Sequence, residues 1–93
     1  MLKLFRIQQD TTGAYRLSEI FVNVGNIFFI TENLEIKSKI NEGKIQLAIN
    51  PAAGFSDIHL ANSINGSKTI TVVGQPDIIE TKINSNKRQL LRD

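Results

Sequence analysis

Isoleucine constrains this fold most strongly, because it fills fourteen of the 93 positions and recurs in short runs that alternate with polar residues. A branched Cβ packs well on the pleated surface of a strand and is restricted in a helix. Six glycines stand singly between these runs, where they act as turn residues. The sequence therefore predicts a mainly β chain, and its length fits a single domain over 1–93, since one core commonly serves about 100–150 residues.

The first third of the chain contains three predicted strands. The first spans 2–8 and the second spans 15–24, where the alternation changes parity near Ser18, which predicts a bulge or bend. Residues 27–32 are apolar on both faces, and this pattern is typical of a central strand that is buried on both sides.

The rest of the chain predicts two hairpins and a helix. Residues 34–40 and 45–49 alternate on either side of a tight turn, and 58–61 and 69–73 do so across a longer loop. From 76 to 91 the period changes to that of a helix, with proline first and basic residues in the last turns. The predicted fold is a small, strongly bent antiparallel sheet or barrel with a C-terminal helix.

Composition excludes several classes of function. Cysteine is absent, so disulfide frameworks, zinc ribbons, iron-sulfur sites and thiol catalysis are excluded. The net charge of +2 is spread evenly and does not by itself indicate nucleic acid. The longest apolar run is four residues, 27–30, and no signal-peptide pattern is present. These features predict a cytoplasmic protein that does not contact a membrane.

A serine, an aspartate and a histidine fall within four residues, from Ser56 to His59. On a strand, Asp57 and His59 point to one face and Ser56 to the other, so they cannot meet as a catalytic triad. The single glycines form no phosphate-binding motif, and no calcium-loop spacing is present. The sequence therefore predicts a protein that is not an enzyme and has no cofactor or metal.

Two short segments resemble the motifs of the Sm/LSm-like barrels. Thr31–Ile36 (TENLEI) is similar to the Asn-Leu-x-Leu end of the first Sm motif, and Ile64–Lys68 (INGSK) is similar to the Ile-Arg-Gly turn of the second. The whole chain also resembles small proteins of marine phages, of cyanophage type, with that fold. It departs from the Sm pattern because Asn65 stands where the family has an RNA-contacting arginine, and because its helix is C-terminal.

The Sm-like resemblance implies a ring of several copies joined edge to edge, which covers strand edges that would otherwise be exposed. Such a ring would bind single-stranded RNA or DNA in phage nucleic-acid processing, in the cytoplasm of the host cell. By the resemblance, asparagine amides would read base edges, a lysine would neutralise phosphate and a glycine would let the backbone approach. These nucleic-acid-binding residues are Asn33, Asn65, Gly66 and Lys68.

Base stacking requires aromatic side chains that are exposed among polar residues. Tyr15 and Phe55 each stand next to loop residues and are the stacking candidates. Phe28 and Phe29 are flanked by isoleucines, so we expect them in the core and in a subunit interface.

Other interpretations stay open at this point. Asn33 and Asn65 also fit turn chemistry alone. A second resemblance, to a small flagellar-operon family, rests on Phe21–Asn23 followed by Ile27 and Ile30. It also rests on a strand at Lys68–Val72 that leads into a Pro-Asp-Ile helix start, and it implies no nucleic acid. The alternative function is a structural or protein-interaction subunit, for phage assembly or regulation, that adds a strand to a partner's sheet.

Overall fold

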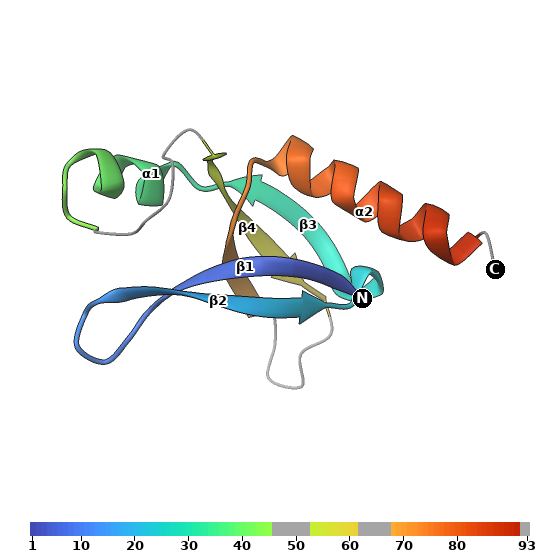
Figure 1. The fold of residues 1–93 in the computed structure, drawn as a ribbon, viewed down its shortest axis with the longest axis horizontal. Coiled ribbons are helices and arrows are strands. Elements are labelled where there is room, and N and C mark those ends of the chain that lie inside the picture. Colours follow the sequence, from blue (N-terminus) through green and yellow to red (C-terminus); the bar gives the residue numbers. More distant parts are fainter. Residues whose placement is uncertain (46–52, 62–67, 92–93) are drawn as a thin grey trace.

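The computed structural model describes residues 1–45, 53–61 and 68–91, with side chains as far as Asn86. It consists of five strands, two α-helices and a short 3-10 turn (Figure 1). In chain order these are β1 (Leu2–Gln9), β2 (Tyr15–Val22), η1 (Val24–Asn26), β3 (Ile27–Glu32), α1 (Leu34–Asn41), β4 (Phe55–Leu60), β5 (Lys68–Val73) and α2 (Pro76–Leu91).

The five strands form one antiparallel sheet in the order β2-β1-β5-β4-β3. Strands β2 and β3 are neighbours in the sequence and are joined by η1, yet they form the two edges of the sheet (Figure 1). The sheet is therefore bent but not closed. The predicted mainly β fold with a C-terminal helix is confirmed, and it is an open sheet rather than a barrel.

One core lies between the sheet and α2. Ile79 of α2 is fully buried, and Ile83 packs against the same cluster one turn later. Pro76 begins the helix and Asp77 lies in its first turn, where the helix dipole favours an anion. The buried members of this first core are Leu2, Leu4, Val22, Ile58, Ile70, Val72 and Ile79. Within the described ranges, no helix has the length and hydropathy needed to cross a membrane.

A second core lies on the opposite face of the sheet, beneath α1. Its buried residues are Ile7, Ile36, Ile45 and Phe55. The register places it on the other face, because Ile7 lies opposite Thr71 and its neighbour Arg6 lies opposite Val72 of the first core. The sheet therefore carries a helix on each face, and each helix covers its own apolar cluster.

The two cores explain the change of parity in β2. Tyr15, near its start, packs against the second core, and Val22, at its end, belongs to the first. Strands β1 and β2 pair without interruption over eight residue pairs. The pairing contains no bulge near Ser18, so that part of the prediction is wrong: the apolar positions change face because the strand contributes to two cores on opposite faces.

Residues 34–41 form the helix α1, so the strand predicted at 34–40 is wrong. Ile36 and Ile40 are four residues apart and both pack against the second core, which requires the helical period. The predicted return strand at 45–49 falls mostly outside the described residues. The second predicted hairpin is confirmed, because β4 and β5 pair over six residues.

Candidate binding surface

Strand β3 lies at an edge of the sheet, not at its centre as its apolar sequence predicts. Its only described pairing is with β4. Phe28 is 73% exposed and Phe29 is 47% exposed, so the prediction that they lie in the core is wrong. Only the inward-facing Ile27 and Ile30 pack against the first core. An edge strand has fewer covering neighbours, and this leaves both phenylalanine rings at the surface.

A bulge in β3 brings the two rings together. The register with β4 shifts between Ile27 and Phe29, so Phe28 is the extra residue. Successive side chains of a regular strand point to opposite faces, whereas a bulge redirects them. The Phe28 and Phe29 ring centroids lie 5.4 Å apart in an edge-to-face arrangement. We call the surface formed by Phe28, Phe29 and His59 the aromatic edge.

His59 is held in place from three sides. Its ring stacks on that of Phe29, with centroids 4.0 Å apart and planes 16° apart. Its two ring nitrogens each lie 3.1 Å from a threonine hydroxyl, Nε2 from Thr31 and Nδ1 from Thr69. One nitrogen of neutral imidazole donates and the other accepts, and a hydroxyl can serve in either role. The described partners of the imidazole ring are therefore one stacked ring and two hydroxyls.

The structure confirms that Ser56 faces away from Asp57 and His59. Ser56 is buried, and its hydroxyl donates to the carbonyl oxygen of Gly74 at 2.6 Å. It cannot be a nucleophile for His59. Within the described ranges, no three His, Asp or Glu side chains are grouped as metal ligands.

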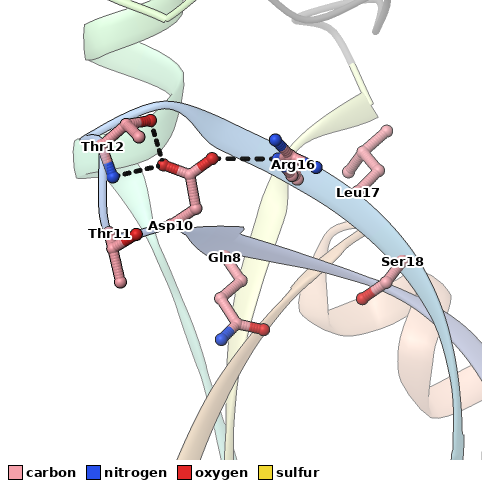
Figure 2. Close-up of a pocket in the computed structure, with 7 residues that line it drawn as sticks. All are labelled: Gln8, Asp10, Thr11, Thr12, Arg16, Leu17 and Ser18. Carbon is pink, nitrogen blue, oxygen red and sulfur yellow. Dashed lines mark hydrogen bonds and ion pairs between the residues drawn. The ribbon is translucent and has the colours of Figure 1, made fainter.

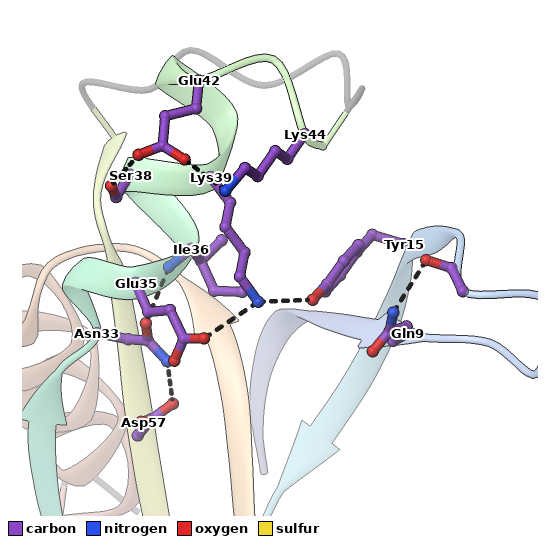
Figure 3. A network of polar contacts seen from close by, with 11 residues as sticks. Gln9, Tyr15, Asn33, Glu35, Ile36, Ser38, Lys39, Glu42, Lys44 and Asp57 are labelled. Atoms are coloured by element: carbon purple, nitrogen blue, oxygen red, sulfur yellow. Dashed lines mark hydrogen bonds and ion pairs between the residues drawn. The ribbon is translucent and has the colours of Figure 1, made fainter.

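Asn33 is the N-cap of α1 (Figure 3). Its side-chain oxygen accepts from the backbone N–H of Ile36 at 3.1 Å, and its amide nitrogen donates to Asp57 at 2.9 Å. Thr71 also donates to Asp57, at 2.7 Å. These bonds give Asn33 the role of a turn residue that also ties α1 to β4, which was the alternative to base reading.

Tyr15 helps to anchor α1 from the other edge strand, β2 (Figure 3). Its hydroxyl accepts from the Lys39 ammonium at 3.3 Å, and the same ammonium lies 3.1 Å from the Glu35 carboxylate. The hydrogen bond to Glu35, followed by that to Tyr15, raises the pKa of Lys39 above its ordinary value. Tyr15 is half-buried here and lies on the opposite edge of the sheet from Phe29.

The structure does not gather the predicted nucleic-acid residues into one site. Asn33 pairs with Phe55 at one end of β4, and Lys68 pairs with Leu60 at the other, roughly 16 Å away at the rise of a strand. Phe55 has no exposed surface, so its predicted stacking role is wrong: it fills the second core instead. Asn65 and Gly66 lie outside the described residues.

A hollow at the tip of the β1–β2 hairpin is lined by six polar residues and Leu17 (Figure 2). Asp10 organises this tip, because its carboxylate accepts from the hydroxyl and backbone N–H of Thr12 and from the Arg16 guanidinium. The backbone N–H of Ala14 donates to the same carboxylate at 3.1 Å. Every contact serves the turn, so we assign this hollow a structural role.

We expect the hairpin tip to lose stability in acid. The Thr12 hydroxyl, foremost among these donors, lowers the pKa of Asp10 below its ordinary value. A carboxyl with a lower pKa in the folded state stabilises the fold above its unfolded pKa and loses that contribution as pH falls through the folded pKa. Asp10→Asn should therefore lower the thermal midpoint near neutrality, and the gap to wild type should shrink between about pH 5 and pH 2. Circular dichroism melts of both proteins measure the gap, and a gap independent of pH would contradict the assignment.

The aromatic edge was missed from the sequence because the run at 27–30 fits burial on both faces. The two adjacent phenylalanines could nevertheless have indicated an exposed ring. Neighbouring side chains of a strand point to opposite faces, so a single core cannot bury both of them. Comparison with known proteins finds no protein-family model, no curated protein and no solved structure that matches this chain.

Proposed function

We propose that this chain is a non-enzymatic protein that binds single-stranded RNA or DNA and works as a homo-oligomer. The observation that carries the proposal is the exposure of Phe28 and Phe29 at the edge of the sheet. His59 stacks on Phe29, and Thr31 lies two residues beyond Phe29 and contacts His59, so polar groups adjoin the rings. Exposed aromatic rings among polar residues are the means by which proteins hold single strands without reading their sequence.

The positive charge of the chain gives modest support to a nucleic acid as the partner. The chain carries a net charge of +2, and exposed Lys68 lies opposite Leu60, the residue that follows His59 in β4. One lysine neutralises one phosphate, so a single copy would bind weakly. Several copies on one strand raise the affinity through avidity.

Open strand edges support self-association. Among the described strands, β2 and β3 have no partner on their outer sides. Pairing β2 of one copy with β3 of the next would cover both edges and could close into a ring. The Sm-like and marine-phage resemblance would place such a ring in phage nucleic-acid processing.

A salt titration of oligonucleotide binding tests the proposal. Fluorescence anisotropy should detect binding of U-rich or A-rich single strands at low salt, with log affinity falling linearly in log salt. Lys68→Gln should reduce that slope by about 0.7, the value per phosphate for a single strand. Lys82→Gln, an exposed lysine on α2, is the matched control and should leave the slope unchanged.

Two outcomes would count against the proposal. Absence of binding by any single strand at low salt would remove the nucleic-acid function. A monomeric mass in solution by light scattering would remove the oligomer and the avidity it supplies.

A second candidate function is supported by the outer edge of β3, which pairs with none of the described strands. An extended segment of a partner protein could add to that edge through backbone hydrogen bonds. This structural or protein-interaction role needs no lysine, so it predicts partner binding that is insensitive to Lys68→Gln.

A further inference from the structure

We propose that the aromatic edge is a stacking site for one unpaired nucleobase, with the Phe28 ring as its platform. This rests on the proposed nucleic-acid function and assigns it a place. A hollow of about 380 Å³ opens at this point, lined by Phe28, Phe29, His59, Leu60 and Ala61. Its walls are largely aromatic rings, which present flat faces to a flat ligand.

The Phe28 ring has little role in the fold. It is 73% exposed, belongs to neither core cluster, and stands at the extra position of the bulge. Its described ring partner is Phe29, which it meets edge to face. With 73% of its surface exposed, the Phe28 ring is accessible to an incoming ring.

The neighbouring rings are already ordered. Phe29 is stacked on His59, and His59 is held by Thr31 and Thr69 through both ring nitrogens. Side chains that are fixed before binding lose little conformational entropy when a ligand arrives. The wall next to Phe28 is therefore preformed.

The chemistry of the hollow favours a base of a single strand. Stacking on an aromatic ring needs a free π-face, which bases of an intact duplex have already given to their neighbours. The site therefore takes unpaired bases of either RNA or DNA, with stacking rather than charge supplying most of the affinity.

The test measures whether the Phe28 ring contributes to binding only when the strand carries bases. Full-length protein is titrated with a single strand of about ten nucleotides and with a strand of equal length made of abasic units, which keeps the phosphates and lacks the bases. Phe28→Ala should weaken binding of the intact strand about 5- to 150-fold and leave the already weaker abasic binding unchanged. Phe28→Tyr keeps an aromatic ring and should bind like wild type.

Phe5→Ala is the matched control, because Phe5 is 46% exposed on the inner strand β1 and belongs to neither core cluster. It should leave the intact strand bound as in wild type. Thermal melts of all variants should agree within a few degrees, since each substituted ring is exposed.

The outcomes separate this site from the function on which it rests. Binding of the intact strand that Phe28→Ala does not weaken, or equal losses for intact and abasic strands, would overturn the stacking site and leave the proposed function standing. If no strand binds, both fail. If Phe28→Ala instead dissociates an oligomer and leaves the affinity for nucleic acid unchanged, the aromatic edge is an interface between copies and the stacking site is wrong.

Discussion

Phe55→Ala should lower the free energy of unfolding by about 3–5 kcal/mol, which is the usual cost of truncating a buried phenylalanine. Phe55 has no exposed surface and packs with Ile7, Ile36 and Ile45 in the second core. Its removal leaves a cavity between α1 and the sheet. A chain of this size has only about 5–14 kcal/mol of stability in total, so the loss is a large share of it.

Urea denaturation followed by circular dichroism measures this loss. Phe21→Ala is a control of identical chemistry on an exposed side chain, and it should change stability by less than about 0.5 kcal/mol. The far-UV spectrum of Phe55→Ala should also show loss of helix, because α1 packs on the sheet through this core. Equal losses from the two substitutions would contradict the second core.

Gly74→Ala should cost about 1–3 kcal/mol from backbone strain alone. Gly74 has φ +123°, outside the region that L side chains readily adopt, and it links β5 to α2. A Cβ there would lie 3.1 Å from Cδ1 of the fully buried Ile79. The backbone cannot turn away easily, because its carbonyl accepts from the buried Ser56 hydroxyl and its N–H donates to the Gly54 carbonyl.

Gly43→Ala provides the comparison. Gly43 follows α1 with φ +76°, nearer the left-handed region, and a Cβ there meets nothing within 4 Å. It should cost only the strain of a left-handed alanine, roughly 1–2 kcal/mol. Chemical denaturation of the two variants should therefore show the larger loss at Gly74, and a larger loss at Gly43 would contradict the tight joint between β5 and α2.

The local alternation of apolar and polar residues was enough to predict the strands and helices whose apolar residues all pack into one core. The β4–β5 hairpin shows this, because Ile58 and Ile70 lie opposite each other in a single core. The C-terminal helix is another case, since Pro76 sets its start. Where the pattern was compatible with two periods, it misled: Ile36 and Ile40 fit a strand by alternation and a helix by their four-residue spacing.

The candidate surface was the least predictable part. Asn33 was singled out by the resemblance of Thr31–Ile36 to an Sm motif, and its side chain serves as a helix cap. Phe55 was expected at the surface and is buried, whereas Phe28 was expected in the core and is exposed. Whether an aromatic residue is covered depends on which strands and helices lie over it, and that order is not encoded in its neighbours along the chain.

The sequence by itself determined a mainly β chain with a C-terminal helix, because isoleucine alternation and glycine-marked turns act over a few residues. It also determined that Ser56 and His59 lie on opposite faces, since strand period settles that locally. Only the tertiary structure decided that one sheet has a core on each face, that β3 is an edge strand, and that Phe28 is exposed beside Phe29 and His59. Each of these depends on contacts between segments far apart in the chain, which short-range patterns do not specify.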